Sequence, residues 1–118
     1  MSDEMTKVAL ITGACGGIGK ALVYKYASQG VSLAIADKSL EEVTLLVDEV
    51  VSMGGTAKAF SGDLTKQGYC DNLPNDVKQE FGRIDILVNN AGLIRRGTIT
   101  DTTAVSYTHL TLPTILLV

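Results

Sequence analysis

A glycine-rich turn is the stretch of this sequence best suited to bind a charged ligand. It lies between an apolar run at residues 8–11 and a helical pattern that starts at Ile18, and its glycines are Gly13, Gly16, Gly17 and Gly19. Backbone N–H groups at a helix N-terminus attract anions, and Gly17 and Gly19 have no Cβ that would keep a phosphate away. The turn therefore predicts a phosphate site, with strand-to-helix packing as the alternative role for its glycines.

Asp37 ends the next apolar run, residues 31–37. It follows the glycine turn by about 20 residues, a spacing at which a carboxylate can accept hydrogen bonds from the adenosine ribose of NAD. The same charge would repel the 2′-phosphate of NADP, although neighbouring Lys38 could attract it. No Arg or Lys lies between Gly13 and Gly19. We expect NAD as the cofactor, with NADP less favoured; a plain turn role for Asp37 is the alternative.

Two further polar segments follow predicted strands, a weaker one at residues 56–61 and an apolar one at residues 84–88. Asp63 and Leu64 come after residues 56–61, where the carboxylate could bind the adenine amine and the leucine could pack on the ring. An ordinary loop aspartate is the alternative. The sequence Asn-Asn-Ala-Gly at residues 89–92 follows the apolar run 84–88. Its small residues would let the chain pass close to the cofactor, while its asparagines could bind loop backbone groups.

Helical patterns separate these apolar runs. The first has Ile18, Leu22 and Tyr26 on one face, with Ala21, and ends before Gly30. A strand–helix alternation of this kind predicts an α/β fold, with a parallel sheet and helices on both of its faces. Ligands of such sheets bind beyond the carboxyl ends of the strands, where the polar segments lie.

The second and third helices carry their own start and stop signals. Ser39 and Glu42 form a capping box, after which Leu40, Val43, Val47 and Val50 are expected to line one face of a helix that ends at Gly54 and Gly55. The third helical region is predicted at residues 65–81, where Gly68 and Pro74 should interrupt or kink it.

Composition restricts the class of protein. The 118 residues suit one domain, and a net charge of −3 without a basic run favours neither nucleic acid nor a membrane surface as partner. Cys15 and Cys70 lack metal-ligand spacing, and no secretory signal or membrane-spanning run is present, so a cytoplasmic location is expected. Cys15 is interpreted as a small filler residue; the alternative is a redox-sensitive thiol whose pKa the helix N-terminus lowers.

Together these segments resemble the N-terminal half of the short-chain dehydrogenase/reductase family. The motif residues are Thr12 to Gly19, Asp37, Asp63-Leu64 and Asn89 to Gly92, within a match covering about residues 6–103. The resemblance implies a Rossmann-type doubly wound sheet, truncated after the fourth strand. It places the pyrophosphate at Gly13, Gly17, Ile18 and Gly19, the ribose at Asp37, the adenine at Asp63 and Leu64, and the nicotinamide side at Asn90, Ala91 and Gly92.

The family implies hydride transfer between a nicotinamide and an alcohol or carbonyl substrate, usually in a homo-oligomer. Its catalytic tyrosine and lysine, four residues apart, have no counterpart here, because no lysine follows Lys78 and position 111 is a threonine after Tyr107. We therefore expect this chain to be inactive. Ser106 and His109 do not support a hydrolase, since no third partner or nucleophile turn accompanies them.

The C-terminal residues suggest a foreign origin. Residues 105–114, VSYTHLTLPT, are the translation of the end sequence of a common transposon-based sequencing-library adapter. In the reading frame that gives these residues, the codon for position 104 must end in CT, which allows only Ala, Ser, Pro or Thr, and the codon for position 115 must begin with A. The chain meets both requirements with Ala104 and Ile115. We expect residues 1–104 to be the N-terminal part of an NAD(P)-binding domain and residues 105–118 to be adapter read-through; the alternative is a natural C-terminal strand with the sequence TILLV. Residues 84–88 would then form an exposed apolar sheet edge that promotes aggregation.

Three functions fit the sequence. The first is an NAD-dependent alcohol dehydrogenase or carbonyl reductase of unspecified substrate. The second is an NADPH-dependent 3-oxoacyl carrier-protein reductase, against which Asp37 argues. The third is a non-catalytic NAD-binding domain.

Sequencing the source gene across codon 104 tests the origin of the tail. The adapter hypothesis predicts that the reading frame continues into a Tyr-x-x-x-Lys helix. Genomic DNA that encodes VSYTHLTLPTILLV and a stop would contradict it and would favour the non-catalytic domain.

Overall fold

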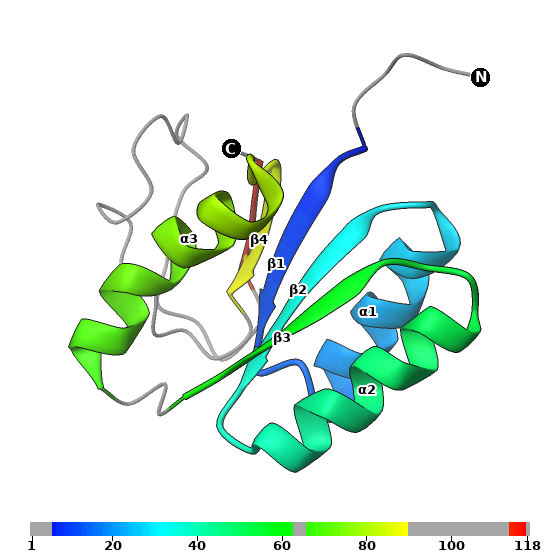
Figure 1. Cartoon of the computed structure of the whole chain (residues 1–118), viewed down its shortest axis with the longest axis horizontal. Coiled ribbons are helices and arrows are strands. Elements are labelled where there is room, and N and C mark those ends of the chain that lie inside the picture. The colour runs from blue at the N-terminus through cyan, green and yellow to red at the C-terminus, as the bar shows by residue number, and fades with distance from the viewer. Residues whose placement is uncertain (1–5, 63–65, 90–113, 118) are drawn as a thin grey trace.

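The computed structural model describes residues 6–62, 66–89 and 114–117. Strands and helices alternate along the chain up to residue 89, and a short strand follows near the C-terminus (Figure 1). The elements are β1 (Val8–Thr12), α1 (Gly17–Ser28), β2 (Ser32–Asp37), α2 (Leu40–Ser52), β3 (Ala57–Ser61), α3 (Gln67–Phe81), β4 (Ile86–Asn89) and β5 (Thr114–Leu117). The α/β fold expected from the alternation is confirmed.

The sheet has the strand order β3-β2-β1-β4-β5. The first four of these strands are parallel, and β1 pairs with β2 on one side and with β4 on the other. The chain thus moves outward from β1 to β3 and then crosses back to the far side of β1. Ligands of a doubly wound sheet usually bind in the crevice at such a reversal, which here falls at the carboxyl ends of β1 and β4.

Helices cover both faces of the sheet: α1 and α2 lie on one side and α3 on the other (Figure 1). Alternate residues of β1 face opposite layers, because successive side chains of a strand point to opposite faces. Leu10 packs in a cluster with Leu73 and Val77 of α3. Ile11 packs in a second cluster with Val23 of α1 and Val43 of α2. Both faces of β1 are therefore buried, which explains its unbroken apolar run.

The predicted ends of α1 and α2 are largely confirmed. Gly30 has a positive φ of 81° directly after the C-cap of α1, a conformation that glycine adopts without strain. The Ser39 side chain accepts a hydrogen bond from the Glu42 amide at 3.3 Å and caps α2. The α2 face is only partly as expected, since Val43, Leu46 and Val50 are buried and Leu40 is exposed.

The predicted interruption of the third helix is wrong. α3 runs from Gln67 to Phe81 through both Gly68 and Pro74. Pro74 lacks an N–H for the helical hydrogen-bond ladder, but it is buried with its neighbours Leu73 and Val77. Burial of this apolar face stabilises the helix in spite of the unfavourable residue types.

The predicted exposed edge at residues 84–88 is also wrong. β5 pairs with β4 in antiparallel register, with Val88 opposite Ile115 and Ile86 opposite Leu117. The chain thereby covers with its own C-terminal residues the edge that the sequence suggested would be open. Antiparallel pairing satisfies the outward backbone groups of β4, which would otherwise attract another chain.

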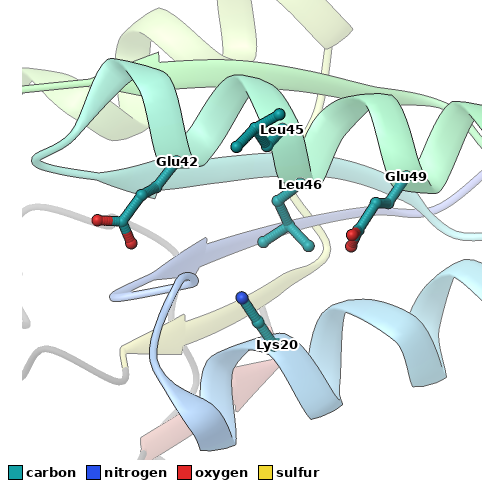
Figure 2. Close-up of a pocket in the computed structure, with 5 residues that line it drawn as sticks. All are labelled: Lys20, Glu42, Leu45, Leu46 and Glu49. Carbon is teal, nitrogen blue, oxygen red and sulfur yellow. The ribbon is translucent and has the colours of Figure 1, made fainter.

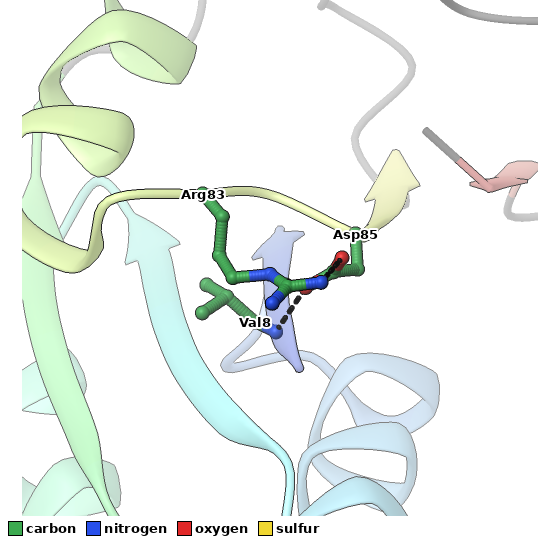
Figure 3. A network of polar contacts seen from close by, with 3 residues as sticks. All are labelled: Val8, Arg83 and Asp85. Atoms are coloured by element: carbon green, nitrogen blue, oxygen red, sulfur yellow. Dashed lines mark hydrogen bonds and ion pairs between the residues drawn. The ribbon is translucent and has the colours of Figure 1, made fainter. Parts of the chain in front are cut away.

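The N-terminal end of β1 is fixed by a carboxylate (Figure 3). Asp85 Oδ2 accepts hydrogen bonds from the Val8 amide at 2.8 Å and from Arg83 Nε at 2.8 Å. Arg83 Nη2 donates to Asp85 Oδ1 at 2.6 Å, which completes a two-pronged ion pair. Burial raises the pKa of Asp85, but the Arg83 hydrogen bond, the Val8 amide and the charges of Arg83 and Lys7 outweigh it, so the pKa is lowered overall.

Removing residues 114–118 should cause self-association. The truncation exposes the apolar edge of β4, so light scattering should show a rise in mass with concentration that the full chain does not show. Substituting the exposed Glu49 by Gln serves as a control that leaves β5 in place. A truncated chain that stays monomeric over the same concentrations would contradict this account of β5.

Asp85→Ala should destabilise the fold by about 2 kcal/mol at pH 7, because it leaves the Val8 amide and Arg83 without their acceptor. Since the folded pKa of Asp85 lies below its ordinary value of 3.8, its stabilisation is complete above that value and is lost as pH falls through the folded pKa. Urea unfolding should therefore show a difference between variant and parent that shrinks towards pH 3.

Glu80→Ala is the matched control for this substitution. Glu80 pairs with Lys58 at 2.7 Å, but both side chains are about half exposed. We expect a change within about 0.5 kcal/mol. An equal loss of unfolding free energy in the two variants would show that the Asp85 contacts stabilise the fold no more than an exposed ion pair does.

Candidate functional site

The candidate site lies at the carboxyl edge of the parallel strands. Strand register places Thr12 opposite both Ala36 and Asn89, so β1, β2 and β4 end at one level. The glycine turn leaves β1 at this edge, and Asp37 ends β2 beside it. The predicted residues Gly13, Gly17, Ile18, Gly19 and Asp37 are thus brought together. Asp63, Leu64, Asn90, Ala91 and Gly92 lie outside the described residues.

Gly13 and Gly19 are required by the backbone geometry of the turn. Gly13 has a positive φ of 64°, in the left-handed region that glycine adopts readily. A Cβ on Gly19 would lie 2.3 Å from the Gly13 carbonyl oxygen and 2.8 Å from Ala14 Cα. Both are backbone atoms that cannot move aside, so only glycine lets α1 begin this close to the end of β1.

Gly17 is different, because a Cβ there would meet no described atom within 4 Å. Gly17 is the first residue of α1, and no described side chain caps the helix at Gly16. The first N–H groups of a helix have no acceptor within the helix, and they carry the positive end of its dipole. The space in front of Gly17 is therefore open and electropositive, as an anion site requires.

Ile18 corrects the predicted face of α1. Its side chain is 54% exposed, whereas Gly19 and Val23 are the buried residues of the helix. Leu22 and Tyr26 are partly buried, which places them at the margin of the buried face of α1. The buried face is rotated by one residue from the expected one, because Gly19 has to contact the turn. Ile18 remains available at the edge of the sheet as an apolar contact.

Asp37 accepts two backbone hydrogen bonds. The Cys15 amide donates to Oδ2 at 2.9 Å and the Lys38 amide to Oδ1 at 2.7 Å. A carboxylate has about four lone-pair positions, so each oxygen retains capacity for a ligand hydroxyl. The sequence analysis identified Asp37 but missed its contact with the glycine turn, since no spacing rule joins it to Cys15.

The expectation that the helix N-terminus lowers the pKa of Cys15 is wrong. Burial, followed by the charges of Asp37 and Glu42 and a hydrogen bond to Asp37, raises the pKa of this thiol to about 11, although Lys20 acts in the opposite direction. The thiol is therefore protonated at neutral pH, which removes the basis for a redox-sensitive thiolate. The shift also shows that two carboxylates lie close to the glycine turn.

A shallow hollow lies between α1 and α2, next to this cluster. Figure 2 shows Lys20 of α1 extending towards α2, where Glu42 and Glu49 flank Leu46. Leu45 completes the lining. Two carboxylates and one ammonium give the hollow a net negative charge. Glu42 was predicted only as a capping residue, so sequence reasoning missed its charge near the candidate site.

Buried polar groups also meet at the reversal of the sheet. The Thr12 hydroxyl lies 3.4 Å from both the Val88 carbonyl oxygen and Asn89 Oδ1, and it can donate its one proton to either. Thr12 and Asn89 are almost fully buried. This contact joins the end of β1 to the end of β4.

Within the described ranges, no group of His, Cys, Asp and Glu side chains could hold a metal ion. None of the helices described in the structure is both long enough and apolar enough to cross a bilayer.

Comparison with known proteins agrees with this geometry. The short chain dehydrogenase family matches residues 7–111. An uncharacterized oxidoreductase of Thermotoga maritima is 43% identical over 96 residues, which are 81% of this chain and 38% of that protein. The chain thus spans little more than a third of the length of this relative.

Solved structures show the same fold. A metagenomic short-chain oxidoreductase in complex with NADP is similar with a TM-score of 0.70 and 34% sequence identity, and the match covers 77% of this chain and 41% of the oxidoreductase. A short-chain dehydrogenase/reductase from Burkholderia phymatum in complex with NAD is similar with a TM-score of 0.69 and 33% sequence identity, and the match covers 78% of this chain and 33% of the Burkholderia protein. The chain belongs to the short chain dehydrogenase family of oxidoreductases.

Proposed function

We propose that this chain binds NAD at the carboxyl edge of the sheet, as the nucleotide-binding part of an oxidoreductase. The contrast between Gly17 and Gly19 carries the proposal. Gly19 is needed for packing inside the protein, but Gly17 has open space in front of it at a helix N-terminus. A pyrophosphate beside Gly17 would use this space and the unpaired helix N–H groups.

The remaining contacts follow from the same arrangement. Gly13, Gly17, Ile18 and Gly19 would hold the pyrophosphate side, and Asp37 would accept hydrogen bonds from the adenosine ribose. Residues outside the described ranges complete the proposed site: Asp63 and Leu64 at the adenine, and Asn90, Ala91 and Gly92 at the nicotinamide side. When bound, the nicotinamide would supply hydride chemistry for an alcohol or carbonyl substrate in the full-length enzyme.

Electrostatics favours NAD over NADP. The two solved relatives were described with different nucleotides, so likeness alone does not choose between them. In the proposed site Asp37 would lie at the ribose, and the charge of a second carboxylate, Glu42, is close enough to contribute to the raised pKa of Cys15. A 2′-phosphate would meet both charges, with Lys20 and Lys38 as the opposing cations. The Asp37 carboxylate is held by its hydrogen bond from the Cys15 amide, whereas the side chains of Glu42, Lys20 and Lys38 are all exposed, so the fixed charge at this position is negative.

The glycine contrast gives a direct test. Gly17→Ala should leave the melting temperature unchanged or slightly higher, because alanine is the better helix former, yet it should weaken NAD binding at least about tenfold by occupying the phosphate space. Gly19→Ala should destabilise the fold itself, by roughly 1–3 kcal/mol. Thermal unfolding and calorimetric titration with NAD measure both effects. A stable Gly17→Ala variant with unchanged affinity would contradict a phosphate site here.

Calorimetry with the two nucleotides tests the cofactor choice. We expect NAD to bind at least about tenfold more tightly than NADP, since a 2′-phosphate placed next to the fixed Asp37 carboxylate is repelled. Raising the salt concentration should narrow the difference by screening the charges. Equal affinities, or tighter NADP binding, would overturn the assignment to NAD. We also expect no turnover of NADH by this chain, which lacks the Tyr-x-x-x-Lys pair of the family.

A further inference from the structure

The glycine turn is attached to the end of β2 by two adjacent hydrogen bonds. The Ala14 amide donates to the Ala36 carbonyl oxygen at 3.2 Å, and the Cys15 amide donates to Asp37 Oδ2 at 2.9 Å. The second bond is the stronger one, because its acceptor is charged. Beyond Cys15 the chain turns back on itself, with the Gly16 amide 3.3 Å from the Gly13 carbonyl oxygen. The Cys15 amide is thus the last point at which β2 holds the turn before α1 begins.

The other oxygen of Asp37 fixes the carboxylate itself. Oδ1 accepts from the Lys38 amide at 2.7 Å, so the side chain is held against its own backbone while it bonds the turn. The two backbone hydrogen bonds together give the carboxylate a defined orientation.

We propose that Asp37 is a positioning residue for the glycine turn as well as an acceptor for the ribose. By holding the Cys15 amide, it sets the path of residues 13–16 and hence the direction of the N–H groups at the start of α1. Loss of Asp37 then weakens the binding of a pyrophosphate that the carboxylate does not touch. The effect on pyrophosphate rests on the proposed function, whereas the effect on the turn does not.

Charge and positioning make opposite predictions for a ligand without ribose. If Asp37 acts only through its charge, its removal takes a negative group away from the phosphate site and should tighten pyrophosphate binding. If Asp37 positions the turn, removal frees the Cys15 amide and should weaken binding. The sign of the change therefore separates the two roles.

The experiment compares Asp37→Ala and Asp37→Asn with the parent chain, using inorganic pyrophosphate as the probe. Asp37→Ala should weaken pyrophosphate binding several-fold and speed hydrogen exchange of the Cys15 amide roughly tenfold or more. Asp37→Asn keeps one acceptor oxygen but no charge, so it should restore most of the pyrophosphate affinity where that oxygen bonds the Cys15 amide, and should not restore it where the oxygen bonds the Lys38 amide instead. Asp48→Ala, on an exposed position of α2, is the control and should change neither measurement.

Unchanged or tighter pyrophosphate binding by a folded Asp37→Ala variant would overturn the proposal, and so would unchanged exchange of its Cys15 amide. If Asp37→Ala fails to fold, Asp37→Asn decides: pyrophosphate affinity that follows protection of the Cys15 amide, parent-like where the amide stays protected and weaker where protection is lost, supports the positioning role. Tighter binding, or lost protection with unchanged affinity, overturns it. If the parent chain itself fails to bind pyrophosphate, the proposed phosphate site is wrong, while amide exchange still tests the positioning of the turn.

Discussion

The close approach of α1 to the end of β1 is the constraint on which the candidate site depends. Gly19 lies against the Gly13 carbonyl and the Ala14 backbone at distances that leave no room for a Cβ. This contact determines where the helix begins and points its first N–H groups out over the edge of the sheet. The openness at Gly17 follows from the same placement, since the helix starts beside the crevice and not within the core. Packing and binding are thus assigned to two glycines only two residues apart.

Charged groups are paired differently at the two ends of the sheet. At the carboxyl edge, backbone amides and carboxylates face open space, and Asp37 holds the turn that presents them. At the opposite edge, Asp85 ties the start of β1 to Arg83, and these groups satisfy one another. Charges that are fully paired stabilise the fold, while those with spare hydrogen-bonding capacity remain available to a ligand. The proposed site therefore involves the groups at the carboxyl edge and not the paired charges at the opposite edge.

Local signals in the sequence were sufficient for the order of the elements and for the residues at the strand ends. The apolar runs identified β1, β2 and β4 because buried parallel strands are apolar on both faces, whereas β3, a partly exposed edge strand, gave a weaker signal. The buried face of α1 could not be read from periodicity, since the contact of Gly19 rotates it away from Ile18. Neither could the continuity of α3, because Pro74 is tolerated only through burial with Leu73 and Val77. Two other features, the pairing of β5 with β4 and the bond from Cys15 to Asp37, join residues far apart in the chain and leave no local pattern.

The central claim is that the edge formed by the glycine turn and Asp37 is a nucleotide site. A titration of the isotope-labelled chain with NAD, followed by the chemical shifts of its backbone amides, tests it most directly. The account predicts that the shifts change at residues 13–19 and at Asp37 and Lys38, and stay constant at Arg83 and Asp85. Changes centred on the hollow between α1 and α2, or no changes at saturating NAD, would contradict it.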